Sequence, residues 1–232
     1  NFTSKKSENS TEVRLNDNNA VFSPVQCASL MRASLLHDLS HEGFDSSFLK
    51  KSFSPYIFIF GPTSTLAHLH ASTAVSLLQD FLIYERSGMN QNENFWTTLT
   101  ESIIATDISQ ISDFLIAIQS ISKSFDKKND EHLMMLSKLL IQIANAARCF
   151  RPFDISKKFA QSLAEERARQ NEAALESQLK PDEVKKVNES EIGFIDSIVS
   201  PLVQALCEID GNFVFLMERL KETRLSWSNL SE

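Results

Sequence analysis

The string LLHDLSHEGFDSSFL holds the residues whose types and spacing could do chemistry: His37 and Asp38 are adjacent, and His41 follows one helical turn after His37. Imidazole nitrogens and carboxylate oxygens are both ligands of divalent cations, so the adjacent pair could bind one cation together. A His-Asp pair at the end of an apolar helix is more often a cap or a hydrogen-bonded pair. Taken alone, the string leaves a metal site and a structural cap as alternatives.

The elements that must position this pair are predicted to be helices throughout. Apolar residues recur at helical spacing in eight stretches, and the two-residue alternation that indicates strands is not evident. The chain has only five glycines, fewer than the turns of a sandwich or barrel of this size require. We therefore predict an all-α fold with helices over residues 25–38, 65–86, 93–105, 107–124, 130–149, 155–178, 190–208 and 212–227.

Two of these stretches predict the core. Residues 130–149 are apolar on nearly every face, which is typical of a buried helix. Residues 190–208 stay apolar across Pro201, and a proline inside a helix removes a backbone donor. We expect the first helix at the centre of the domain and the second as a kinked, buried wall.

Length and charge narrow the class of protein. A chain of 232 residues can bury one substantial core. We predict a polar lead-in over residues 1–21 and one helical domain over residues 22–232. The net charge of -7 argues against nucleic acid as a partner, because nucleic-acid binders usually present a basic face.

Cysteine use and hydropathy predict the compartment. Cys27, Cys149 and Cys207 are odd in number and lie in apolar helical contexts, which suits reduced core thiols. No secretory or transit signal is recognisable in the first residues. Residues 52–79 carry no Lys, Arg, Asp or Glu, but two prolines and Gly61 interrupt that stretch. We therefore expect a cytoplasmic protein without a membrane span.

Further blocks follow the His37 string in a fixed order. The block LAHLHASTAVSLLQDF carries His70, and ESIIATDIS carries Asp107. Two longer blocks, ANAARCFRPFDISKKFAQSLAEERARQNE and SEIGFIDSIVSPLVQAL, complete the series. Together the five blocks resemble the catalytic domain of the class I 3',5'-cyclic-nucleotide phosphodiesterases over roughly residues 25–228. The family's metal motif, His-Asp-x-x-His-x-Gly with a following Phe-Leu, is matched by His37, Asp38, His41, Gly43, Phe48 and Leu49.

The resemblance implies the family's compact, multi-helix HD-type domain and its two-metal hydrolysis. In that chemistry two divalent cations hold a hydroxide that attacks the cyclic phosphate. A histidine in an upstream Tyr-His-Asn-x-x-His motif protonates the leaving oxygen. No histidine precedes His37 in these 232 residues, so that motif has no counterpart here.

The resemblance also assigns roles to single positions. It implies that His37 and Asp38 are metal ligands. It also implies that His41, His70 and Asp107 contact those ligands and hold them in place without binding the metal themselves.

Three substitutions weaken the implied metal site. The second aspartate of the family falls on Asn145, which keeps an oxygen but loses the charge. Ser40 replaces an aspartate of the metal motif, and Arg148 places a cation near the expected metals where the family has asparagine. We expect at most one divalent cation (Mg, Mn or Zn), held weakly or not at all.

The nucleotide pocket implied by the resemblance is also altered. Phe194 matches the phenylalanine that holds the purine, and Glu191 takes the place of the glutamine that reads the base edge. An ionised glutamate only accepts hydrogen bonds, which would favour guanine over adenine because guanine presents N1–H and an amino group together. Ordinary core packing for Phe194 and a solvated position for Glu191 are the structural alternatives.

Three functions fit this pattern on one fold. The first is a degenerate phosphodiesterase, a pseudoenzyme that serves as an interaction or regulatory subunit with a protein partner. The second is an active cyclic-nucleotide phosphodiesterase that takes the missing histidines from upstream sequence or another chain. The third is a sensor that binds cyclic AMP or cyclic GMP without hydrolysis.

Overall fold

The computed structural model of the chain describes residues 20–82, 91–180 and 186–230. All regular elements in those ranges are helical, which confirms the all-α prediction. Most of the predicted lead-in, residues 1–19, lies outside the described residues. The α-helices are α1 (Pro24–Leu36), α2 (Ser46–Lys51), α3 (Pro55–Phe60), α4 (Thr65–Leu82), α5 (Glu93–Ile104), α6 (Ile111–Ser122), α7 (Asp130–Asn145), α8 (Phe153–Glu176), α9 (Val187–Phe194), α10 (Ser200–Ile209) and α11 (Val214–Ser228).

Short 3-10 and π segments join several of these helices. The 3-10 segments are η2 (Ile108–Gln110), η3 (Ala147–Phe150) and η5 (Gly211–Phe213), and the π segment is η4 (Ile195–Val199). The predicted helix 107–124 is therefore η2 followed by α6, and the predicted helix 130–149 is α7 followed by η3.

Helices α2 and α3 were not predicted. Each has six residues, which is too short for an apolar period to show. Their starts are set by local caps instead: the Asp45 carboxylate accepts from the backbone N–H of Phe48, and the Ser54 hydroxyl accepts from that of Tyr56. Gly61, with φ of +85°, ends α3 in a backbone region that favours glycine.

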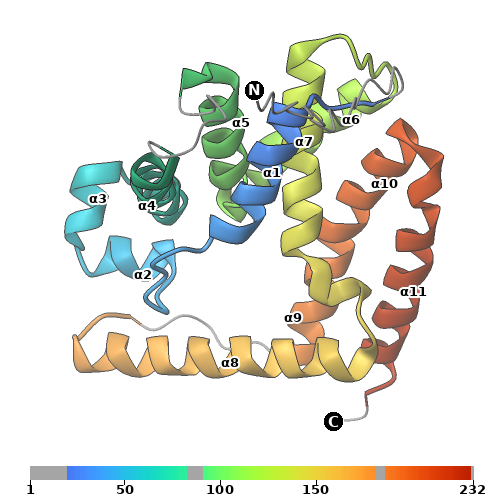
Figure 1. Cartoon of the computed structure of the whole chain (residues 1–232). Helices are drawn as coiled ribbons and strands as arrows, with labels where there is room; N and C mark the ends of the chain where they lie inside the picture. Colours follow the sequence, from blue (N-terminus) through green and yellow to red (C-terminus); the bar gives the residue numbers. More distant parts are fainter. Residues whose placement is uncertain (1–19, 83–90, 181–185, 231–232) are drawn as a thin grey trace, which may run out of the picture.

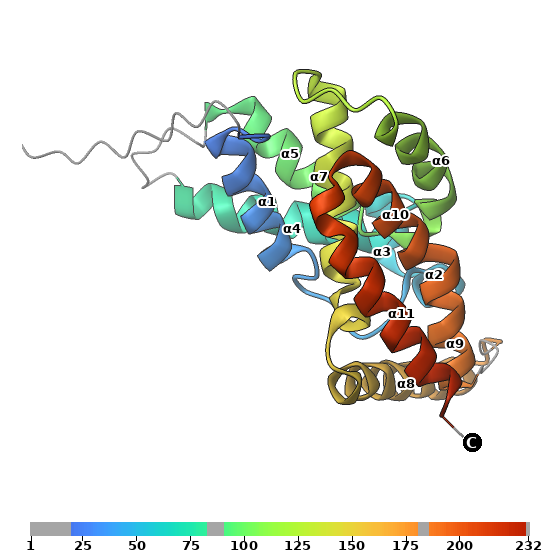
Figure 2. The same cartoon turned by 90° about the vertical axis from the view of Figure 1, so that its right-hand side faces the viewer.

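Helix α7 stands at the centre of the domain, as its sequence predicts (Figure 1). Its residues Leu139 and Ile143 belong to a core cluster with α6, α10 and α11, whereas Ile141 belongs to a second cluster with α1, α4 and α5. Figure 2 shows α10 and α11 side by side, and both helices supply residues to the first of these clusters. Helix α7 therefore contributes side chains to both clusters.

The predicted distortion at Pro201 is a π-helical turn. The run from α9 to α10 passes through η4 just before Pro201, which occupies the first turn of α10. A proline has no backbone N–H to donate to a carbonyl of the preceding turn. The wider hydrogen-bonding pattern of a π turn accommodates the missing bond. The core residues of this wall are Ile195, Val199, Leu202, Val203, Ala205 and Leu206.

By length and mean hydropathy alone, one described helical run could cross a membrane. It is the wall Val187–Ile209, with a mean hydropathy of 1.5, and not the uncharged stretch 52–79. Core helices of globular domains pass the same test, and this wall supplies much of the larger core cluster.

Helix α8 runs beneath the other helices (Figure 1). Its charged sequence predicts a solvated face, but Gln170 is buried. The Gln170 amide accepts from the backbone N–H of Asp45 at 2.8 Å and donates to the Asp45 carboxylate at 3.1 Å. This contact ties α8 to the loop between the His37 string and α2.

The three cysteines are unpaired, but they are not all core thiols as predicted. Cys149 is fully buried, and burial raises the pKa of its thiol to about 11. Cys207 is half-buried, and Cys27 is exposed because it lies on the outer face of α1.

Candidate functional site

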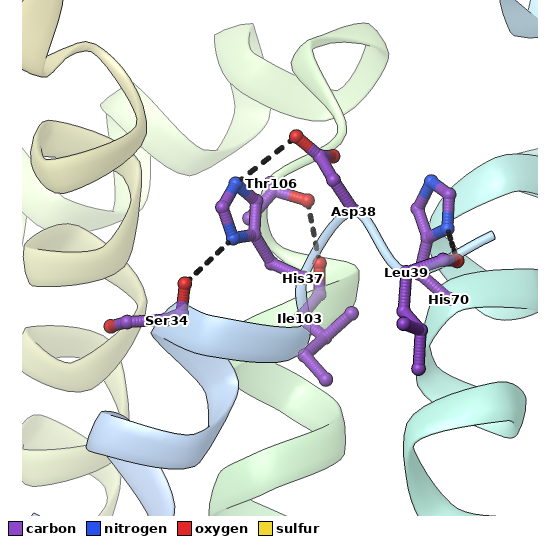
Figure 3. A network of polar contacts seen from close by, with 7 residues as sticks. All are labelled: Ser34, His37, Asp38, Leu39, His70, Ile103 and Thr106. Atoms are coloured by element: carbon purple, nitrogen blue, oxygen red, sulfur yellow. Dashed lines mark hydrogen bonds and ion pairs between the residues drawn. The ribbon is translucent and has the colours of Figure 1, made fainter. Parts of the chain in front are cut away.

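His37 and Asp38 form a close pair at the end of α1. A capping box between Ser23 and Gln26 begins this helix, and His37 is its C-terminal cap. His37 donates from Nδ1 to the Ser34 carbonyl over 3.0 Å, and its Nε2 lies 3.2 Å from the Asp38 Oδ2 atom (Figure 3). The backbone contact therefore fixes the ring so that Nε2 faces the carboxylate.

The pair shifts the titration of both groups. The hydrogen bond to Asp38 raises the pKa of His37 above its ordinary 6.5, although burial opposes the shift. The same hydrogen bond lowers the pKa of Asp38 below its ordinary 3.8. Each side chain thus favours the charged form of the other, and a cation that binds both would have to compete with this hydrogen bond.

His70 and His41 lie behind this pair. His70, on α4, is only 3% exposed, and its Nδ1 donates to the Leu39 carbonyl over 2.7 Å (Figure 3). Burial lowers the pKa of His70, so the neutral ring is favoured. The His41 ring stacks on His70 at 5.7 Å between centroids. His70 therefore anchors the backbone of the residue that follows Asp38, and its predicted support of metal ligands stays a prediction.

Asn145 joins the pair, whereas Asp107 does not. Asn145 ends α7, and its side chain lies near enough to His37 to help raise the pKa of that ring. The Asp107 carboxylate instead accepts from the N–H and hydroxyl of Ser109 and caps η2. In the described part of the chain, no contact links Asp107 to His37 or Asp38. Asp107 therefore does not support the predicted metal ligands by direct contact.

The donor set fits one cation better than two. Nε2 of His37 and Oδ2 of Asp38 are 3.2 Å apart, close to the separation of neighbouring ligands that each lie about 2.1 Å from a metal. Asn145 could add a neutral amide oxygen. Within residues 20–82, 91–180 and 186–230, no group of three His, Cys, Asp or Glu side chains could hold a metal ion. A divalent cation bound by His37 and Asp38 would therefore be coordinated by one carboxylate, that of Asp38.

A pocket of about 290 Å³ opens beside Asn145. Its rim and walls come from the ends of α5 and α7, from η2 and η3, and from α8, α9, η4 and α10. The lining residues are Thr106, Ile108, Gln142, Asn145, Ala146, Arg148, Leu163, Arg167, Ser190, Glu191, Phe194, Ile198 and Leu202. Asn145 thus belongs both to the pair at His37 and to the pocket that holds Glu191 and Phe194.

Glu191 is not solvated, as one sequence-based alternative held, but is 3% exposed and paired with Arg148. Arg148 donates from Nε and Nη2 to the two carboxylate oxygens over 3.2 and 3.3 Å. Its guanidinium carbon lies 4.3 Å from the centroid of the Phe194 ring. The carboxylate of Glu191 therefore compensates the positive charge of Arg148, so that this charge repels a nearby cation less.

Phe194 lies at the border of the core and the pocket, so core packing is observed and purine binding stays a prediction. It packs against the larger core cluster, and it lines the pocket with Arg148 over its ring. Sequence reasoning noticed Arg148 and Glu191 separately but missed their contact. The available signal was that both departures from the family pattern are charged and opposite in sign.

Curated proteins that are similar in sequence to this chain are cyclic-nucleotide phosphodiesterases. The chain is 26% identical over 193 residues to the high affinity cGMP-specific 3',5'-cyclic phosphodiesterase 9A of Drosophila melanogaster, covering 80% of this chain and 13% of that protein. It is 25% identical over 224 residues to a cGMP-specific 3',5'-cyclic phosphodiesterase of the same organism, covering 90% and 20%. The chain thus spans a fifth or less of these two curated relatives.

A solved structure shares the architecture. The phosphodiesterase domain of the Salpingoeca rosetta rhodopsin phosphodiesterase superposes with a TM-score of 0.79 at 20% identity, covering 88% of this chain and 66% of that one. The model of the family described as 3'5'-cyclic nucleotide phosphodiesterase matches residues 9–220. The chain belongs to the 3'5'-cyclic nucleotide phosphodiesterase family.

Proposed function

We propose that this chain is a pseudoenzyme of its family, which does not hydrolyse cyclic nucleotides and acts in the cytoplasm as an interaction or regulatory subunit. One observation carries the proposal: the cation position next to His37 offers a single carboxylate, Asp38, because Asn145 supplies only an amide. Two-metal hydrolysis needs anionic oxygens to hold and neutralise two cations. His37, Asp38 and Asn145 would hold one cation weakly, and that cation could polarise a phosphate oxygen.

The chain's own residues hold the two side chains of the pair together. His37 donates to both Ser34 and Asp38, and His70 holds the adjacent backbone at Leu39. The contacts of His37 with Ser34 and Asp38 are made by the chain alone.

A role as a subunit draws support from the surface. Several large apolar side chains are strongly exposed, among them Leu35 on α1 at 82% and Phe58 on α3 at 76%. The partner proposed here is a protein that would cover side chains of this kind.

Metal-dependent hydrolysis is the second candidate function, and the geometry of His37 and Asp38 favours it. The 3.2 Å separation of His37 and Asp38 suits two ligands of one cation. Cyclic GMP is the first substrate to test, since the relatives named above are cGMP-specific.

Steady-state hydrolysis decides between the two. Purified chain is incubated with cyclic GMP or cyclic AMP and Mg²⁺ or Mn²⁺, beside the variant His37→Ala/Asp38→Ala. We expect equal, background product formation from both proteins. Product formation that the double substitution abolishes would overturn the proposal in favour of the active enzyme.

A further inference from the structure

A pocket of about 320 Å³ lies where the start of α8 meets α11, and we call it the α8–α11 pocket. The chain that links η3 to α8 and one face of α11 form its lining, which consists of Phe150, Arg151, Pro152, Phe153, Arg219, Glu222, Thr223 and Ser226. None of these residues lines the pocket beside Asn145. A ligand bound between α8 and α11 would therefore occupy a different place from the implied cation and the implied nucleotide.

Two arginines bring positive charge to the α8–α11 pocket. Arg151 is exposed, and within the described part of the chain its side chain forms no hydrogen bond or ion pair. Arg219 contacts the Glu222 carboxylate over 3.2 Å, but these two side chains are 65% and 67% exposed. Exposed ion pairs contribute little to stability, so Arg219 can exchange Glu222 for another anion at small cost. The lining thus offers two guanidinium groups against one carboxylate.

Thr223 supplies an independent observation that points to a ligand. It is only 4% exposed and lines the pocket, and no hydrogen bond of its hydroxyl is found among the residues that the structure describes. A helical hydroxyl commonly donates to the carbonyl four residues earlier, as Ser226 does to Glu222 over 2.9 Å. A largely buried hydroxyl without a partner is unfavourable. An oxygen acceptor bound in the pocket is the partner that Thr223 lacks.

The start of α8 also favours an anion. This helix has 24 residues and follows directly on Pro152, and in the part of the chain that the structure describes no side chain caps its first turn. Backbone N–H groups at such an end, together with the helix dipole, attract negative charge. Asp154 in the first turn offsets part of this effect, but it is not one of the lining residues.

We propose that the α8–α11 pocket binds an organic phosphate monoester. A phosphate group has several acceptor oxygens, and guanidinium groups recognise it with paired N–H donors. Here the donors are Arg151, Arg219, the Thr223 hydroxyl and the start of α8, which together exceed what the two oxygens of a carboxylate need. The pocket has the size of a small-molecule site and is larger than a phosphate group alone. The rings of Phe150 and Phe153 provide apolar walls for the organic part.

This inference goes beyond the proposed function and does not depend on it, because His37, Asp38 and Asn145 take no part in the site. Its competitor is a general attraction of anions to arginines on the surface. General attraction predicts no preference for an organic phosphate, and it predicts that one arginine matters as much as another.

Calorimetric titration of the full chain with phenyl phosphate, in 0.1 M salt without divalent cations, tests the ligand class. We expect saturable binding at one site, with inorganic phosphate binding at least about tenfold more weakly because it lacks the ring. Benzoate, which has the ring but only a carboxylate, should also bind at least about tenfold more weakly. Phenyl phosphate that does not bind saturably overturns the proposal, and so does equal affinity for either of the other two anions.

Variants test the place of binding. Arg151→Ala should weaken the binding of phenyl phosphate by about tenfold or more, whereas Arg167→Ala removes the same charge from the pocket beside Asn145 and should change it by less than about twofold. Equal losses in these two variants would overturn the proposal in favour of general attraction. Glu222→Gln should tighten binding, because it removes the carboxylate that competes for Arg219.

Thr223→Val gives a further test that does not change the charge of the chain. Its hydroxyl has no partner to lose, so urea denaturation should show no loss of stability. The affinity for phenyl phosphate should nevertheless fall by about threefold or more. A folded Thr223→Val variant with unchanged affinity would contradict the proposed contact and overturn the site as described.

Discussion

Arg148 and Glu191, 43 residues apart in the sequence, form a two-bond ion pair inside the pocket next to Asn145. Glu191 is 3% exposed, so its charge depends on this partner for compensation. A buried pair of this kind is no more stabilising than well-packed apolar residues, but removal of one member leaves an uncompensated charge.

Arg148→Ala should therefore lower the free energy of unfolding by about 3–5 kcal/mol, measured by urea denaturation. The matched variant Arg148→Ala/Glu191→Gln should lose distinctly less, because no buried charge remains. Equal losses in the two variants would contradict a role for Arg148 in compensating Glu191.

The sequence identified each of these two residues as a departure from the family pattern, but not that the departures meet in space. The sequence suggested that Glu191 replaces the glutamine that hydrogen-bonds the base. It suggested that Arg148 places a positive charge beside the metals. Whether a side chain on η3 turns toward α9 or toward α1 depends on packing between elements, which spacing within one helix does not contain. The helical fold and central α7 followed from apolar periodicity, whereas α2 and α3 were too short to give any period.

His37 and His70 should titrate on opposite sides of pH 6.5. The hydrogen bond to Asp38 raises the pKa of His37, and burial lowers the pKa of His70. His37 thus adds stability that is present below pH 6.5 and lost as the pH rises through its folded pKa. For His70, stability is lost as the pH falls below 6.5 toward its folded pKa.

Imidazole NMR titration of the folded chain measures both values. Asp38→Asn should move the pKa of His37 downward, since Asp38 is the first cause of its shift. Coincident titration of the two histidines, or the reverse order, would be inconsistent with the geometry.

Asn145→Asp should strengthen divalent cation binding. The substitution restores a second carboxylate beside His37 and Asp38, and ligand charge is a main determinant of affinity for hard cations. We expect roughly tenfold tighter binding of Mn²⁺ by isothermal titration calorimetry. The gain should vanish when His37→Ala and Asp38→Ala are added; a gain that persists would place the cation elsewhere.

Leu139 and Leu35 form a matched pair for the core. Leu139 on α7 is fully buried, whereas Leu35 on α1 is 82% exposed. Leu139→Ala should lower the free energy of unfolding by about 2–5 kcal/mol, because it leaves a cavity between packed helices. Leu35→Ala should change it by less than about 0.5 kcal/mol. Similar losses at both positions in urea denaturation would argue against α7 as the centre of the core.

Single-turnover assay of cyclic GMP, with the chain in large excess over nucleotide and with Mg²⁺ or Mn²⁺ present, tests the central claim most directly. A single carboxylate at the cation position predicts no conversion to 5'-GMP above the rate of the His37→Ala/Asp38→Ala variant. Conversion of the bound nucleotide by the wild type alone would contradict the claim and show that His37, Asp38 and Asn145 suffice for hydrolysis.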